Sequence, residues 1–93
     1  MKITMQDVRD YLATLEPDQI AGEVSEANTC PVALAGEWRY KVMWVITESY
    51  CYPSDHPGQG YAPDPEIVQL IKAIDKIRFA GSVSRSEVEG VLP

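Results

Sequence analysis

The chain has 93 residues, of which 45% are hydrophobic and 24% are charged, proportions that are typical of a folded globular domain and exclude a disordered chain. Its 14 acidic and 8 basic residues give a formal net charge of -6, which repels nucleic-acid backbones and anionic membrane surfaces, so we expect neither as a partner. The N-terminus lacks the apolar segment of a secretory signal, and no window approaches the roughly 18 apolar residues of a membrane span, so we expect a cytoplasmic protein.

A chain of this length leaves no room for a second core, so residues 1–93 are predicted to form a single domain. Its first element is a helix over residues 4–15, because apolar side chains recur at helical spacing after Thr4, a favourable N-cap. Pro17 ends this pattern and begins a turn that carries Ile20 toward Gly22.

Residues 28–36 predict a short second helix, with Pro31 at its first position and Gly36 at a left-handed exit. Beyond Gly36 apolar residues alternate with other side chains, which predicts a strand over residues 38–47 with one buried face. Its partner is either the segment 50–52, after a turn at residues 48–49, or a strand of a second subunit.

Residues 48–64 form a long segment rich in tyrosine, proline and glycine, and no regular element is predicted between residues 53 and 65. A third helix begins with Asp64 as its cap and Pro65 at its first position, and Gly81 is expected to end it. Ser84 and Glu87 form a capping box that opens a short last helix.

These elements predict an α+β fold in which three to four helices pack on a short antiparallel β-hairpin or on a sheet completed by a dimer. The residues placed inward by both periodicities form the predicted core: Leu12, Leu15, Val42, Trp44, Leu70, Ile71 and Ile74.

The predicted strand would leave an exposed edge, because its only partner in the chain is short and ends at a proline. Met43 and Val45 lie on its outward face, which charge alone does not protect from association. Antiparallel pairing of residues 38–47 across a two-fold axis would cover that edge, so a homodimer is one expectation and a small monomeric sheet is the other.

Cys30 directly precedes a helix-starting proline, and a helix N-terminus can stabilise a thiolate, so Cys30 is a candidate reactive thiol. The alternative is a buried structural cysteine.

A thiol- or metal-dependent site could use Cys30, Cys51 and His56, but closely spaced ligand pairs are lacking, so we expect no metal and no other cofactor. Two cysteines are too few for a disulfide framework, and both are expected to be reduced.

The tyrosine-rich segment is the strongest candidate for binding, because tyrosine supplies a large contact area at low entropic cost. Its candidate binding residues are Tyr50, Tyr52, His56 and Tyr61. The alternative is that these tyrosines fold back over the core. No catalytic constellation is recognisable, so the sequence favours an interaction or regulatory module with a protein partner over an enzyme.

The turn at Pro17 and Asp18, the segment from Cys30 to Ala35 and the last two helices occur in this order. This layout resembles that of small uncharacterised bacterial proteins in which a Pro-Asp turn precedes a Cys-Pro segment, a strand and two helices. The resemblance extends over most of the chain as a pattern and implies no activity.

Overall fold

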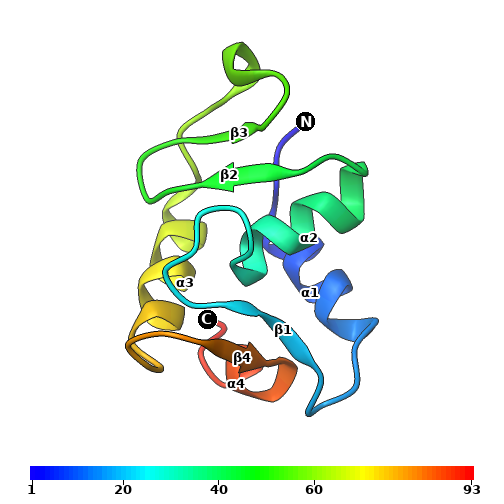
Figure 1. The fold of residues 1–93 in the computed structure, drawn as a ribbon, viewed down its shortest axis with the longest axis vertical. Helices are drawn as coiled ribbons and strands as arrows, with labels where there is room; N and C mark the ends of the chain where they lie inside the picture. The colour runs from blue at the N-terminus through cyan, green and yellow to red at the C-terminus, as the bar shows by residue number, and fades with distance from the viewer.

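Four α-helices, one 3-10 helix and two small antiparallel sheets make up the fold, which is α+β as the sequence predicts (Figure 1). The structure is a computed structural model that describes all residues from Met1 to Pro93. In chain order the elements are α1 (Met5–Ala13), β1 (Ile20–Glu23), α2 (Pro31–Tyr40), β2 (Trp44–Ile46), β3 (Cys51–Pro53), η1 (Pro57–Gln59), α3 (Pro65–Asp75), β4 (Ser82–Ser84) and α4 (Arg85–Glu89).

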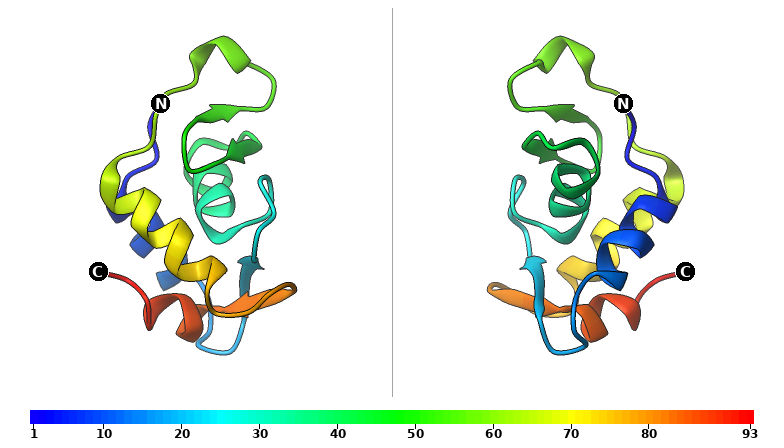
Figure 2. Two further views of the ribbon diagram at one scale, coloured as in Figure 1. Left: turned by 90° about the vertical axis from the view of Figure 1, so that its left-hand side faces the viewer. Right: turned by 90° about the vertical axis from the view of Figure 1, so that its right-hand side faces the viewer.

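The two sheets lie at opposite ends of the molecule, with α1, α2 and α3 between them (Figures 1 and 2). Strands β1 and β4 pair at one end, and the β2–β3 hairpin forms the other. The turn predicted to begin at Pro17 and Asp18 is present, and the residues to which it leads form β1. Neither β1 nor β4 was predicted, since each is very short and gains its hydrogen bonds only from a strand distant in sequence.

The strand predicted over residues 38–47 is mostly wrong, because α2 continues to Tyr40 and only Trp44–Ile46 is a strand. Trp38 and Tyr40 have the two-residue spacing of a strand by coincidence, but both lie on α2. On this helix Trp38 packs on Tyr11, with 6.5 Å between ring centroids. Gly36 does not end α2 either. The left-handed exit is Lys41, whose φ is 63° and whose amide donates to the Glu37 carbonyl.

The other helices follow their predicted signals more closely. The Thr4 side chain caps α1, and the Ser84 hydroxyl accepts from the Glu87 amide in the predicted capping box of α4. Gly81 does not end α3, which stops at Asp75, but it has a φ of 104° in the connection to β4 and its carbonyl accepts from the Val24 amide. No helix combines the length and apolar character that crossing a bilayer requires.

One cluster of 19 buried residues joins the helices and both sheets. Leu12, Trp44, Leu70 and Ile74 belong to it, as predicted. The other predicted core residues, Leu15, Val42 and Ile71, are only partly buried and pack at its margin.

Both edges of the hairpin make backbone contacts within the chain, although only one hydrogen bond reaches the outer edge of β2. The Ile46 amide donates to the Ala27 carbonyl on one side, and Cys51 exchanges two backbone hydrogen bonds with Tyr61 on the other. Residues 38–47 do not form one strand, so the ten-residue strand on which the expected antiparallel pairing rests is wrong. Whether the protein is a homodimer stays a prediction.

We predict that Ile74→Ala lowers the free energy of unfolding by about 2–5 kcal/mol, because Ile74 is 2% exposed and truncation leaves a cavity. Urea unfolding measures this loss. Ile20→Ala is the matched control, since Ile20 is 54% exposed and its truncation should change the free energy by less than about 0.5 kcal/mol. An equal effect of the two substitutions would remove Ile74 from the core.

Candidate functional site

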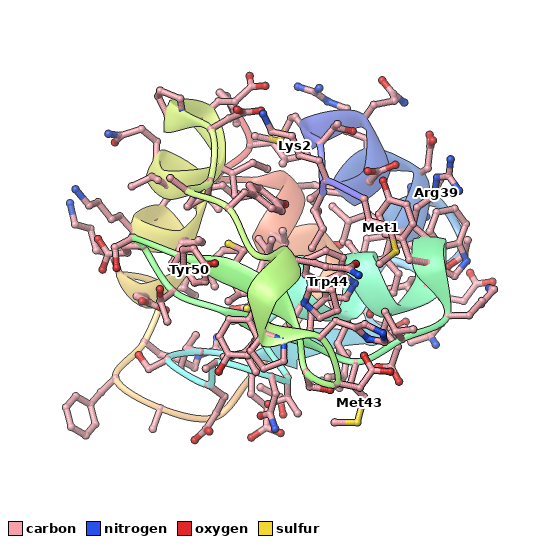
Figure 3. The ribbon with its side chains drawn as sticks, turned by 90° about the horizontal axis from the view of Figure 1, so that it is seen from above. Met1, Lys2, Arg39, Met43, Trp44 and Tyr50 are labelled. Atoms are coloured by element: carbon pink, nitrogen blue, oxygen red, sulfur yellow. The ribbon has the colours of Figure 1, made fainter.

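The β2–β3 hairpin has one buried and one exposed side. Trp44, Ile46, Cys51 and Pro53 are buried, whereas Val45 and Tyr52, which pair with each other, are partly exposed. Side chains alternate across a strand, so Met43 and Tyr50 extend the exposed side. We call these four residues, Met43, Val45, Tyr50 and Tyr52, the hairpin face. Figure 3 looks down on this end of the molecule, with Trp44 near its centre and Met43 and Tyr50 toward its margin.

The tyrosines of the hairpin face are held in place by their surroundings. The Tyr50 and Tyr52 rings have centroids 6.0 Å apart, and the Tyr50 amide donates to the Thr47 hydroxyl over 2.9 Å. Gly60 lies directly against the Tyr50 ring, since a Cβ at this position would be 2.6 Å from the tyrosine oxygen. Contact with Gly60 therefore restrains the Tyr50 ring, although 42% of the residue is exposed.

Segment 48–64 contains more regular structure than the sequence predicts. Besides β3, it includes the 3-10 helix η1, so the expectation of no regular element between residues 53 and 65 is wrong at Pro57–Gln59. The Cys51 amide donates to the Tyr61 carbonyl over 2.8 Å, and the Tyr61 amide donates back over 2.9 Å. These two bonds close the segment into a loop anchored on the hairpin.

Tyr61 differs from the other two candidate tyrosines because its side chain turns toward the core. Its hydroxyl accepts from the Ile3 amide over 2.7 Å, and its ring meets Trp44 edge-on with 6.2 Å between centroids. Burial raises the pKa of Tyr61 to about 12. Tyr61 therefore has the position of the alternative expectation, a tyrosine that folds back over the core.

His56 lies at the start of η1, on the surface. Its Nδ1 is 3.0 Å from an Asp55 carboxylate oxygen, and this hydrogen bond lowers the pKa of Asp55. Both side chains are more than half exposed. They supply an accessible polar pair in the same segment as the hairpin face.

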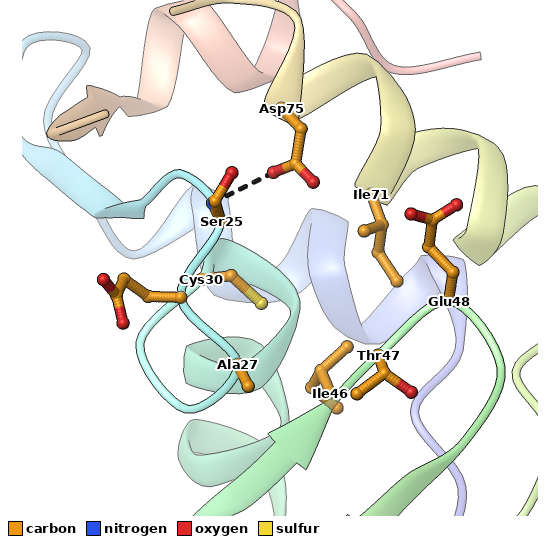
Figure 4. Close-up of a pocket in the computed structure, with 9 residues that line it drawn as sticks. Ser25, Ala27, Cys30, Ile46, Thr47, Glu48, Ile71 and Asp75 are labelled. Atoms are coloured by element: carbon orange, nitrogen blue, oxygen red, sulfur yellow. Dashed lines mark hydrogen bonds between the residues drawn. The ribbon is translucent and has the colours of Figure 1, made fainter. Parts of the chain in front are cut away.

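Cys30 lies in a different place, at the N-terminus of α2, where it lines a cleft of about 280 Å³ between α3, β2 and the loop that precedes α2 (Figure 4). The thiol sulfur accepts from the Ala33 amide over 3.5 Å, so Cys30 caps the helix. Burial nevertheless raises the pKa of Cys30 to about 11, since desolvation outweighs the stabilising amides. The environment therefore opposes the thiolate that a reactive cysteine needs.

The remaining lining of the cleft comes from segments that are far apart in the sequence. Cys30, Ile46 and Ile71 point toward one another across it (Figure 4), and the Ser25 amide donates to an Asp75 carboxylate oxygen over 3.0 Å. The full lining is Ser25, Glu26, Ala27, Cys30, Ile46, Thr47, Glu48, Ile71 and Asp75. Only Cys30 was singled out from the sequence, because no local pattern shows which distant carboxylates will meet.

The geometry gives little support to a thiol- or metal-dependent site that uses Cys30, Cys51 and His56. No group of three or more histidine, cysteine, aspartate or glutamate side chains is arranged to hold a metal ion. Cys51 is buried, its thiol donates to the Thr47 carbonyl, and burial raises its pKa, whereas His56 is exposed. Comparison of the chain with protein-family models, curated protein sequences and solved structures finds no match.

The buried thiol of Cys30 makes stability sensitive to alkaline pH. Its pKa rises from 9.0 to about 11, so its contribution to stability is fully present below pH 9.0 and is lost as pH rises toward 11. We predict that this thiol contributes about 2–3 kcal/mol to the loss of stability over that interval, measured by urea unfolding at successive pH values.

Cys30→Ser is the matched variant for this prediction, because serine keeps the capping acceptor but does not ionise in this range. It should show a shallower loss between pH 9.0 and 11, with the remaining loss due to Cys51, Tyr11 and Tyr61, whose pKa values are also raised. Identical pH profiles for the two proteins would contradict a raised pKa at Cys30.

Proposed function

We propose that this protein is a small interaction module that binds another protein through the hairpin face. The observation that carries the proposal is the exposure of apolar and aromatic side chains on one side of a hairpin whose other side is fully buried. Met43 is 49% exposed and Tyr50 is 42% exposed. Tyrosine and methionine are enriched in protein interfaces, where they bury large areas.

The way the face is built supports recognition by side chains. On the outer edges of the hairpin, Ile46 bonds to Ala27 on one side and Cys51 bonds to Tyr61 on the other, so we place the contact on the exposed side chains and not on an added strand. It would lie across Tyr50 and Tyr52, whose rings are already packed together. A contact surface that is ordered before binding loses less entropy on association.

His56 and Asp55 extend the proposed surface with polar groups. Protein interfaces typically have an apolar centre and a polar rim, and this exposed pair lies in the loop that follows β3. The thiol-dependent alternative has less support, since both cysteines are buried and their pKa values are raised.

The test is photo-crosslinking in the native cell with benzoylphenylalanine at position 45, at the centre of the hairpin face. We expect a discrete covalent product with one other protein, identified by mass spectrometry. With that partner purified, the double substitution Tyr50→Ser and Tyr52→Ser should weaken binding by about 30-fold or more, since interface tyrosines of this kind contribute about 2 kcal/mol or more.

Ile20→Ser supplies the control, because Ile20 is an exposed apolar residue in β1, at the other end of the molecule (Figure 1). It should leave the affinity unchanged, and the crosslinker at position 20 should give no product. Equal weakening by the Ile20 substitution, or binding that survives loss of both tyrosines, would refute the proposed surface.

A further inference from the structure

Phe79 is the most exposed large apolar residue of the chain. It is 98% exposed, whereas the next, Met1, is 58% exposed. Phe79 lies in the connection between α3 and β4, so almost none of its ring is covered by the chain itself. Burial of a ring this exposed would remove a large apolar area from water, so Phe79 is a candidate for insertion into another surface.

The cleft beside Cys30 has the size and the lining to receive such a ring. Its apolar lining consists of Ala27, Cys30, Ile46 and Ile71. Its volume is about 280 Å³, and a cavity of about 150 Å³ is known to hold benzene. The cleft can therefore accommodate a phenyl ring with the backbone that carries it.

The charges around the ring and around the cleft are opposite. Glu26, Glu48 and Asp75 contribute carboxylates to the cleft lining, and Glu48 is paired with Lys72 over 3.8 Å. Phe79 is preceded in the chain by Lys76 and Arg78. Arg78 is paired with Glu87 in its own chain, but exposed Lys76 forms no ion pair and is free to meet a carboxylate. Opposite charges at the two surfaces favour their association and set its orientation.

The ring does not enter the cleft of its own chain, although it follows Asp75 closely. Hydrogen bonds from Val24 to Gly81 and from Ser25 to Asp75 tie the connection to the rim of the cleft. The connection that carries Phe79 therefore borders the cleft.

We propose that two copies of this chain associate about a two-fold axis, with Phe79 of each copy inserted into the Cys30 cleft of the other. A two-fold interface requires that one surface carry both complementary features, and the α3–β4 connection that carries Phe79 borders the cleft. Lys76 of each copy then faces the carboxylates of the other. This interface is separate from the hairpin face and does not depend on its function.

Sedimentation equilibrium from micromolar to millimolar protein tests the proposal. The wild-type mass should rise from 10.3 kDa toward twice that value, and Phe79→Ser should remain at 10.3 kDa throughout. Ala27→Trp, which places a large side chain at an exposed position of the cleft lining, should also prevent the rise. Ile20→Ser and the Tyr50→Ser, Tyr52→Ser pair are controls that should dimerise like the wild type.

The contact between the two chains is measured directly by NMR in a mixed sample of isotope-labelled and unlabelled wild-type protein. Intermolecular nuclear Overhauser effects should connect the Phe79 ring with the methyl groups of Ile46 and Ile71. Circular dichroism should show that Phe79→Ser folds normally, since the ring contacts little in its own chain. The proposal would be overturned if the wild-type protein stays at 10.3 kDa at millimolar concentration. It would also be overturned if the Phe79→Ser variant still dimerises, or if the wild type forms open-ended assemblies larger than a dimer.

Discussion

The contact of Trp44 and Ile3 with Gly36 is the constraint on which the arrangement of the hairpin depends. Trp44 is fully buried and Ile3 is 1% exposed, and both reach the same point on α2. A Cβ at position 36 would lie 2.8 Å from Trp44 Cδ1 and closer still to Ile3 Cδ1, a separation that close-packed interiors do not tolerate. Gly36 is therefore needed in mid-helix for close approach, which explains why it does not end α2.

The same cluster supports the hairpin face. Trp44 packs between the rings of Tyr40 and Tyr61, and the Tyr61 hydroxyl accepts from the amide of Ile3, which itself lies on Gly36. Tyr61 in turn is paired through its backbone with β3. The inner side of the hairpin is thus fixed to α2 and to the N-terminal segment. As a result, the outer tyrosines are presented by a rigid support, the condition under which a small surface binds without first becoming ordered.

Local signals in the sequence predicted local structure well, and they failed where distant segments decide. The caps at Thr4 and Ser84 and the proline start of α3 depend on adjacent residues and are correct. Strands β1 and β4 form their ladder hydrogen bonds with each other, although they are distant in the sequence. At the end of α2, apolar residues alternate with other side chains by coincidence, so this part of the helix was predicted as a strand. Composition marked the tyrosine-rich segment, but only the hairpin register separates the inward Tyr61 from the outward pair. The carboxylates that line the cleft come from distant parts of the chain, so no local sequence pattern predicts that they lie together.

The most direct test of this account is the change in unfolding free energy and in amide exchange on Gly36→Ala. Alanine at an unconstrained helical site stabilises by about 0.5–1 kcal/mol, whereas overpacking a core costs about 1–3 kcal/mol. We predict a net loss of about 1 kcal/mol or more, with faster exchange of the Ile46 and Cys51 amides. Gly58→Ala, whose Cβ meets nothing within 4 Å, should instead stabilise by about 0.4–1 kcal/mol and leave hairpin exchange unchanged. Stabilisation by Gly36→Ala with unchanged hairpin exchange would contradict the account.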